Sequence, residues 1–366
     1  AQALECNISS LLSGVSILNL HSTGMYQTAA LSIQFGLSIR SLSQYLSALG
    51  LHGNTLVMQS FELLTPLIDR STKVPENEMY KTTDYLRNGV LYLNNILRPQ
   101  HKKLSTLMIY STTKCQSRCK HCSIWQKPEE HLSLRDIQKI MASRCVTKNT
   151  VVGLEGGEFI LHPESTAIME WFMRHHPNYT LLSNCLNPQK VIDAVRRYRP
   201  QHLYVSLDGD RDTYKVMRGC NGHDKVIEVV ETLKDEVPIS LMFCLSPWNT
   251  FKDMDYVIGV ARKYKVDVRI GIYGTMDFFN TTADLLRTDK TNYLQSIPDN
   301  IHETEENFDF VALYEEWRNG HLKLRCQSIF CELVIHSNGD VPLCQNLGVK
   351  LGNIHKHSLD EIFNSR

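Results

Sequence analysis

The chain has 366 residues, enough for two or three domains or for one barrel with appendages. Its 39 basic and 39 acidic residues balance, so no basic surplus indicates nucleic acid as a partner. No apolar run of about eighteen residues occurs and no basic segment precedes residues 11–20, so we expect neither a transmembrane helix nor a secretory signal. Eleven cysteines fit metal ligation in a reducing compartment better than a disulfide scaffold, which makes the cytoplasm the expected location.

Residues 1–103 predict a helical N-terminal region. No charged residue occurs between Glu5 and Arg40, and the apolar positions there are set among Ser, Asn and Gln. This pattern favours a helix packed into a core, and a groove for an apolar substrate is the alternative. Further helices are expected at 55–69 and 77–97. Pro99 and the polar run after it then mark a boundary.

Residues 104–275 alternate between short apolar runs and amphipathic segments, which predicts parallel βα units. The expected strands are 104–111, 150–154, 179–183, 202–207, 239–245 and 266–272. Ser133 and Asp136 form a capping-box pattern at the start of one intervening helix. Further helices are expected after Pro163, from Pro188 to before Pro200, and at 222–236 and 251–264. Six units are too few for a closed eight-stranded barrel, so the predicted fold is α/β, a partial (βα)6 TIM-like barrel.

Residues 276–325 predict a mixed acidic linker with a helix, and residues 326–366 predict a small domain of a β-hairpin and a helix. Asn338 and Gly339 lie between two short apolar runs, and this dipeptide favours a type I′ hairpin turn. Ser358 and Glu361 form a second capping box for a terminal helix.

The most informative segment contains Cys115, Cys119 and Cys122. Their spacing places three thiolates on one short loop, close enough to bind three irons of one 4Fe–4S cluster and leave the fourth iron open. A structural zinc knuckle with similar spacing is the alternative. With His121 at the aromatic position before the last cysteine, the motif resembles the signature of the radical S-adenosylmethionine (SAM) superfamily. The resemblance implies that SAM chelates the open iron and is cleaved reductively to a 5′-deoxyadenosyl radical.

Several further motifs follow the predicted strands, where barrel enzymes place their active sites. Gly156, Gly157 and Glu158 resemble the family's Gly-Gly-Glu motif, which holds the SAM amine, although Phe159 replaces the usual Pro. The resemblance assigns the remaining SAM contacts to polar and apolar residues at later strand ends: Ser183, Asn184, Ser206, Asp208, Arg218 and Leu245. Ser206 is a better partner than Asp208 for the SAM carboxylate, because two carboxylates repel. The alternative for Arg218 is a surface residue in a loop.

Cys220 is a candidate hydrogen donor to a substrate radical, because it directly follows Arg218 and Gly219. A buried structural cysteine is the alternative for it.

A second cysteine group comprises Cys326, Cys331 and Cys344. Twelve residues separate Cys326 from Gly339, and four separate Gly339 from Cys344. This spacing resembles the first half of a SPASM domain or the shorter twitch form, and it implies a second, auxiliary 4Fe–4S cluster. A three-cysteine zinc site is the alternative.

The sequence therefore predicts a radical SAM enzyme with an auxiliary cluster that binds substrate or accepts an electron. The resemblance also implies a flavodoxin- or ferredoxin-type electron donor. The expected substrate is a small molecule or a peptide, with a modest preference for a small molecule because residues 1–103 lack the strand-rich pattern of a leader-peptide recognition domain. A SPASM-type maturase of ribosomally made peptides is one alternative. A non-catalytic iron–sulfur or zinc-binding protein is the alternative of another class.

Overall fold

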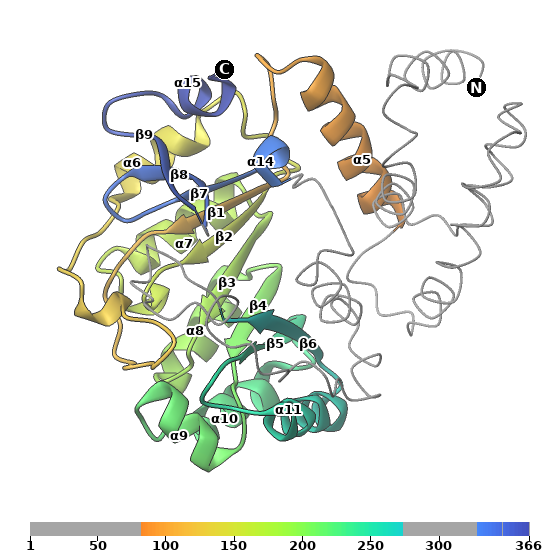
Figure 1. Ribbon diagram of the computed structural model, residues 1–366, viewed down its shortest axis with the longest axis vertical. Coiled ribbons are helices and arrows are strands. Elements are labelled where there is room, and N and C mark those ends of the chain that lie inside the picture. Colours follow the sequence, from red (N-terminus) through yellow and green to blue (C-terminus); the bar gives the residue numbers. More distant parts are fainter. Residues whose placement is uncertain (1–81, 274–327, 346, 366) are drawn as a thin grey trace, which may run out of the picture. The chain divides into compact units, whose positions relative to one another are not determined.

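The computed structural model describes residues 82–273, 328–345 and 347–365 (Figure 1). The chain divides into two compact units, one of Ala1–Val90 with Leu313–Arg325 and one of Leu91–Ala312 with Cys326–Arg366. The first unit contributes only the start of helix α5 (Thr82–Leu97) to the described residues. The uncharged segment, the helix expected at 55–69 and the linker at 276–325 lie outside them. The four predicted domain boundaries stay predictions.

Seven parallel strands form one sheet in the order β6-β5-β4-β3-β2-β1-β7, curled into a half-barrel (Figure 1). Six of them are the strands expected from the sequence, which confirms the partial barrel. These six are β1 (Thr106–Tyr110), β2 (Val151–Glu155), β3 (Tyr179–Ser183), β4 (His202–Ser206), β5 (Ile239–Leu245) and β6 (Asp267–Ile272).

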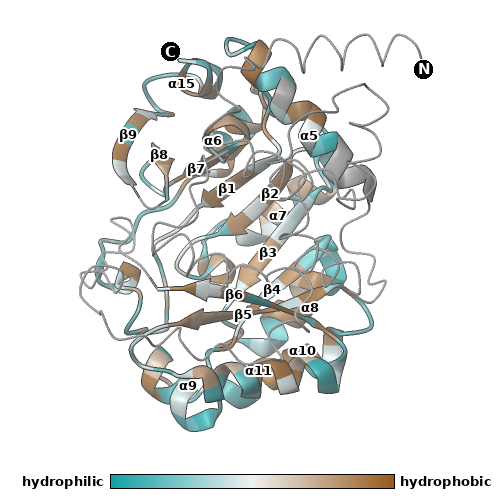
Figure 2. Cartoon of the chain, turned by 45° about the vertical axis from the view of Figure 1, so that its right-hand side comes forward, coloured by the Kyte–Doolittle hydropathy of each residue, from teal (hydrophilic) through white to brown (hydrophobic). Residues whose placement is uncertain are grey.

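Amphipathic helices follow the strands, with brown apolar faces toward the sheet and teal faces outward (Figure 2). They are α6 (Leu134–Met141), α7 (Ser165–His175), α8 (Pro188–Tyr198), α9 (Arg211–Arg218), α10 (His223–Leu233) and α11 (Phe251–Tyr264). The capping box at Ser133 and Asp136 is present. Helix α9 is new relative to the sequence prediction, although Asp210 caps its start and Gly219, with φ 66°, ends it. None of the described helices is long and apolar enough to cross a membrane.

The C-terminal segment contributes the seventh strand. After α14 (Ser328–Cys331), β7 (Glu332–Ile335) pairs in parallel with β1, while β8 (Asp340–Cys344) pairs with β9 (Leu347–Asn353). The predicted small C-terminal hairpin is therefore present as the antiparallel pair β8 and β9, and not between residues 333–336 and 341–343. Because Leu333 and Ile335 are almost fully buried, β7 suits the barrel sheet better than an exposed hairpin.

The turn after β7 also differs from the prediction. His336 O accepts from Gly339 N at 2.8 Å, and His336 N donates to Asp340 O at 2.8 Å. Gly339 has φ 83° while Asn338 keeps a negative φ, so the loop is a turn followed by one left-handed glycine and not type I′. The terminal helix α15 (Leu359–Asn364) carries the predicted capping box of Ser358 and Glu361.

The strand alternation separates the two faces of the half-barrel. Residues such as Ile109, Leu154 and Leu241 are 0 % exposed and face the helices. The intervening residues face the concave side and include nearly all the polar groups of the strands. These concave-face residues include Met108, Tyr110, Glu155, Tyr204, Ser206, Met242, Cys244 and Arg269.

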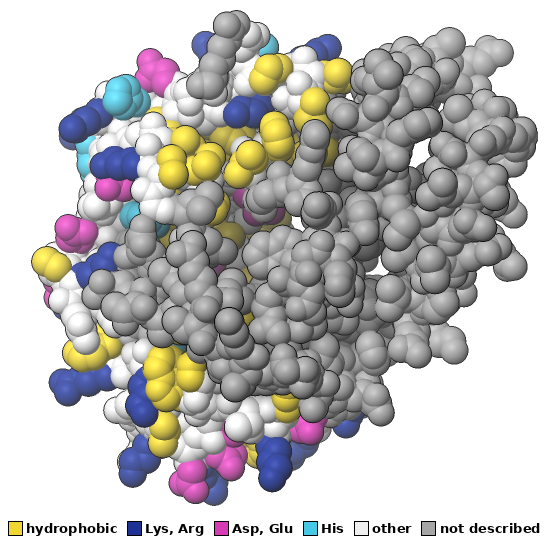
Figure 3. All heavy atoms as spheres, viewed as in Figure 1, with side chains coloured by type: hydrophobic (Ala, Val, Ile, Leu, Met, Phe, Trp, Pro, Cys, Tyr) yellow, Lys and Arg dark blue, Asp and Glu magenta, His cyan; other side chains and the backbone are white. Residues whose placement is uncertain are grey.

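On the opposite, helical side, charged side chains of both signs are interspersed over α9–α11, at the bottom of Figure 3. A hollow of about 680 Å³ among these helices is lined by residues such as Asp210, His223 and Tyr256. It contains none of the site residues predicted from the sequence.

Candidate active site

The loop that contains Cys115, Cys119 and Cys122, called the cysteine loop below, connects β1 to the short helix η2 (Ile124–Gln126). On one side it is held by Gly156, Gly157 and Glu158, called the glycine motif. Gly157 N donates to Thr112 O at 2.7 Å, and Glu158 N donates to Lys114 O at 2.8 Å. A Cβ on Gly157 would lie 2.4 Å from Lys114 O. The two segments can therefore approach this closely only because position 157 is glycine.

The other side of the loop is fixed by the end of α9. Arg118 N donates to Arg218 O at 3.0 Å, and Lys120 N donates to Met217 O at 2.8 Å. Carbonyls in the last turn of a helix have no partner within the helix, so the loop supplies the donors that they lack. Helix α9 thereby positions the segment that contains Cys119.

The three loop cysteines fit an iron–sulfur cluster by their chemistry. All three are free thiols, and Cys115 and Cys122 pack against Tyr110, Ile124 and Val334. Burial raises the pKa of both thiols to about 12, so without a bound cation they are protonated at pH 7, and metal binding would release these protons. No three His, Cys, Asp or Glu side chains in the described ranges converge on a single ion. A 4Fe–4S cluster binds each cysteine thiolate at a different iron, so its ligands do not have to meet at a single ion.

His121 adds a group that a bound ligand would satisfy. Its Nδ1 is buried and has no hydrogen-bond partner among the described residues. Burial lowers its pKa to about 4, so the ring is neutral at pH 7. A buried polar atom without a partner is uncommon, and one beside three thiols fits a site that binds a cofactor.

Glu158 lies at the C-terminal end of the barrel, as predicted, but its carboxylate already has protein partners. Ser183 Oγ donates to Oε1 at 2.9 Å, and Asn184 N donates to Oε2 at 2.7 Å. Burial raises the pKa of Glu158 to about 7, although these hydrogen bonds by themselves would lower it. The Ile160 backbone also bonds to this carboxyl. A carboxylate has about four lone-pair sites, so these three bonds leave room for one contact with the predicted SAM ammonium. That contact stays a prediction.

Asn184 links Glu158 to the cysteine loop. Its Nδ2 lies 3.7 Å from Cys115 Sγ, and its Oδ1 accepts from Gln116 Nε2 at 3.1 Å. The predicted contact of Asn184 and Ser183 with the SAM ribose is untested, and both side chains are engaged with protein groups in the structure.

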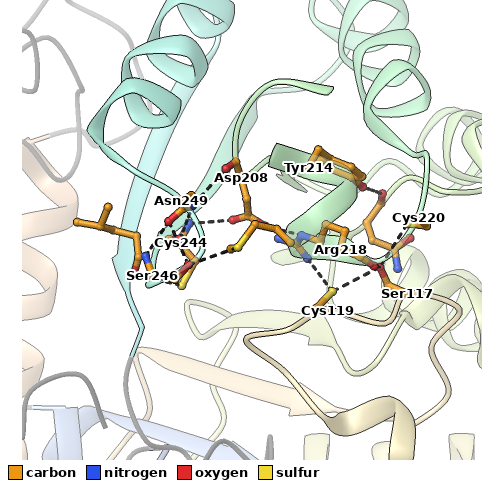
Figure 4. A network of polar contacts seen from close by, with 12 residues as sticks. Ser117, Cys119, Asp208, Tyr214, Arg218, Cys220, Cys244, Ser246 and Asn249 are labelled. Carbon is orange, nitrogen blue, oxygen red and sulfur yellow. Dashed lines mark hydrogen bonds and ion pairs between the residues drawn. The ribbon is translucent and has the colours of Figure 1, made fainter. Parts of the chain in front are cut away.

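Asp208 and Arg218 form a buried ion pair (Figure 4). Arg218 Nε donates to Asp208 Oδ2 at 2.5 Å, and Cys244 N donates to Asp208 Oδ1 at 3.0 Å. The alternative of a surface Arg in a loop is wrong, because Arg218 is the last residue of α9 and only 8 % exposed. The predicted pairing of Arg218 with the SAM carboxylate stays untested, and the guanidinium has a protein carboxylate as its partner.

The remaining predicted SAM residues divide between the two faces. Ser206 is buried on the concave side at the end of β4. Leu245, also buried, lies on the opposite face of β5 from Cys244, so the structure does not bring it to the other candidates. Cys220 lies next to the cysteine loop, with its Sγ 3.9 Å from Ser117 Oγ. Its role as a hydrogen donor stays a prediction.

Tyr110 and Glu155 are concave-face residues that the sequence analysis missed. They are register partners at the ends of β1 and β2, and the Tyr110 phenol bonds to the Glu155 carboxylate. Burial raises the pKa of both groups. Gln345 Nε2 donates to the Tyr110 hydroxyl, so this tyrosine connects the cysteine-loop side of the barrel to the residue after Cys344. Their position in the sequence was the signal that could have found them. Tyr110 ends the strand that leads into the cysteine loop, and Glu155 ends the strand directly before Gly156.

The second cysteine group is only partly described. Cys331 is buried at the end of α14, where Asn95 Nδ2 lies 3.7 Å from its sulfur, and Cys344 ends β8. Cys326 lies outside the described residues. A shared cluster at these three cysteines therefore stays a prediction.

Comparison with known families supports the assignment. Residues 109–258 match the Radical SAM superfamily, and residues 326–366 match SPASM, an iron-sulfur cluster-binding domain. The curated protein "Antilisterial bacteriocin subtilosin biosynthesis protein AlbA" of Bacillus subtilis (strain 168) is 23% identical over 267 residues, which cover 69% of this chain and 58% of that protein. The match therefore spans less than two thirds of that relative.

Among solved structures, Streptococcus suis SuiB bound to S-adenosylmethionine has a similar fold, with a TM-score of 0.57 and 14% identity over 84% of this chain and 78% of SuiB. SuiB bound to its precursor peptide SuiA gives a TM-score of 0.56 and 13% identity over 86% and 79%. The cofactors are a 4Fe–4S cluster with SAM and an auxiliary iron–sulfur cluster. The chain belongs to the radical SAM superfamily of enzymes and carries a SPASM iron-sulfur cluster-binding domain.

Proposed function

We propose that this enzyme is a peptide maturase that uses a SAM-derived radical to abstract hydrogen from a ribosomally made peptide. The observation that carries the proposal is the loop of Cys115, Cys119 and Cys122, fixed on both sides at the C-terminal edge of a half-barrel. The names of the AlbA and SuiB relatives, one a bacteriocin biosynthesis protein and one bound to a precursor peptide, favour a peptide substrate. These names therefore favour a peptide over the small-molecule substrate that the sequence of the N-terminal region suggested.

Cys115, Cys119 and Cys122 would hold the cluster, which would supply the electron for reductive cleavage of SAM and thereby the means of abstracting hydrogen from the substrate. The residues of this chain bind and orient these groups. Glu158 offers the remaining lone pair of its carboxylate to the SAM ammonium, and Ser206 faces the same side of the sheet. The concave face would receive the peptide, with the SPASM domain beside it through β7.

The test uses anaerobically reconstituted protein with SAM, dithionite and candidate peptides encoded near its gene. A peptide carrying deuterium at the modified residue should transfer it to 5′-deoxyadenosine, and the peptide mass should change. Deuterium transfer from a small molecule, with every peptide inert, would contradict the peptide assignment.

The cluster site has its own test. Replacing Cys115, Cys119 or Cys122 by Ala should remove about four irons per chain and abolish SAM cleavage, because two thiolates cannot hold the cluster with its open iron. Cys145→Ala is the matched control, since that buried thiol lies outside the loop. Full iron content and retained 5′-deoxyadenosine formation in a loop variant would exclude that cysteine as a ligand.

A further inference from the structure

Arg218 contacts both the buried acid and a loop thiol. Its Nε donates to Asp208, while its Nη1 lies 3.7 Å from Cys119 Sγ (Figure 4). Asp208 is completely buried. The guanidinium therefore presents separate N–H groups to a carboxylate and to a sulfur, which a planar fork allows and a lysine ammonium cannot reproduce.

The surrounding backbone holds this arrangement in place. Ser117 Oγ and Arg118 N both donate to Arg218 O, at 3.3 and 3.0 Å, and the Cys119 thiol bonds to Ser117 Oγ at 3.4 Å. On the other side, Cys244 N donates to the Asp208 carboxylate, and Asn249 Nδ2 donates to the Asp208 backbone carbonyl. The pair therefore connects the ends of β4 and β5 to one cysteine of the loop.

We propose that Arg218 and Asp208 are positioning residues that set the reduction potential of the cluster bound by the cysteine loop. Arg218 raises the potential through its N–H group and its charge beside the Cys119 sulfur, and Asp208 lowers it by offsetting that charge. The inference rests on the proposed cluster site, and it is independent of the substrate.

The expected signs follow from electrostatics. Reduction adds one electron to the cluster, so a buried cation within hydrogen-bond distance of a ligand sulfur favours the reduced form. Hydrogen bonds to the sulfurs of iron–sulfur clusters are known to tune their potentials in the same direction. Removing the cation and removing the anion should therefore shift the potential in opposite directions.

The experiment is an EPR-monitored redox titration of the reconstituted enzyme without SAM. Arg218→Gln and Arg218→Lys should lower the midpoint potential, and Asp208→Asn should raise it. For Arg218→Gln we expect on the order of a tenfold change in the ratio of reduced to oxidised cluster at fixed potential, which is about 59 mV for a one-electron couple. Arg218→Lys keeps the ion pair with Asp208 and loses the donor to sulfur, so it tests the idea even where the Gln variant fails to fold.

Arg211→Gln is the matched control, because this exposed arginine lies at the other end of α9 and pairs with Asp224. SAM affinity should change by less than about threefold in Arg218→Lys, as measured by anaerobic calorimetry. Shifts of equal sign in the Arg218 and Asp208 variants, loss of iron from both, or potentials equal to the control would overturn the proposal. An unchanged potential with a large loss of SAM affinity would instead assign Arg218 to the SAM carboxylate. A wild-type protein without any cluster would overturn the proposed function itself.

Discussion

Glu158 is a site residue whose pKa the fold moves into the neutral range. The carboxyl is almost completely buried, and burial raises its pKa from 4.5 to about 7 despite the hydrogen bonds from Ser183 and Asn184. In the protein without cofactor, the carboxyl is therefore largely protonated below pH 7 and ionises at a cost above it. A nearby ammonium would favour the ionised form, in keeping with the proposed SAM contact.

This shift predicts a pH dependence of stability. A raised carboxyl pKa stabilises the fold fully below the unfolded value of 4.5, and that contribution is lost as pH rises through about 7. The cofactor-free wild type should lose about 3 kcal/mol of unfolding free energy between pH 4.5 and 8 relative to Glu158→Gln, at about 1.4 kcal/mol per pKa unit. Urea unfolding of both proteins at both pH values measures this. Parallel pH profiles for the two proteins would show that Glu158 has an ordinary pKa.

At the scale of elements, the glycine motif and α9 hold the cysteine loop between them. The loop contains three buried or half-buried thiols. Its carbonyls at Thr112 and Lys114 accept from the glycine motif, and its N–H groups at Arg118 and Lys120 donate to carbonyls at the end of α9. Iron binding therefore depends on the exact distance between β2 and the end of α9 as well as on the cysteines.

Gly157→Ala tests the glycine side of this arrangement. The new Cβ would meet the Lys114 carbonyl at 2.4 Å, so the loop must shift and iron content should fall by half or more. Gly259→Ala is the matched control. Its Cβ would meet nothing within 4 Å in the middle of α11, so it should stabilise the protein by about 1 kcal/mol. Iron analysis and thermal unfolding measure both effects, and full iron in Gly157→Ala would show that the loop tolerates the shift.

At the scale of the whole described unit, the SPASM domain is continuous with the barrel. Strand β7 extends the sheet beside β1, and Gln345 reaches the Tyr110 hydroxyl next to the cysteine loop. The segment that carries Cys331 and Cys344 is thereby connected to the cysteine-loop side of the barrel through the sheet itself. This connection would suit the predicted auxiliary cluster if it anchors substrate or accepts its electron.

A variant in which Cys326, Cys331 and Cys344 are all replaced by Ala tests that role. The wild type should bind about eight irons per chain and the variant about four, since each 4Fe–4S cluster contributes four. The variant should still form 5′-deoxyadenosine, because the first cluster lies on another loop, and it should fail to give the modified peptide. About four irons and one zinc in the wild type would make the C-terminal site a structural zinc site.

Most features that depend on residues close in sequence were predicted correctly from the sequence alone, although the turn at Asn338 and Gly339 and helix α9 were not. The six barrel strands follow from apolar runs, the capping boxes at Ser133 and Ser358 from residues three apart, and the superfamily from a cysteine spacing of a few residues. The strands and caps are stabilised within one strand or one turn, and the cysteine spacing is equally local, so each signal lies within a short window.

Other features depend on contacts between distant segments, and only the tertiary structure decided them. Strand β7 joins β1 across more than two hundred residues, and Arg218 meets both Asp208 and Cys119. The Tyr110 bond to Gln345 is equally non-local. No local sequence pattern shows which buried carboxylate will pair with a buried arginine. The pairing depends on which side chains the packed fold brings together, because a buried charge without a partner destabilises the fold. The sequence by itself thus determined the chemistry and the barrel, and the tertiary structure determined which residues surround the thiols.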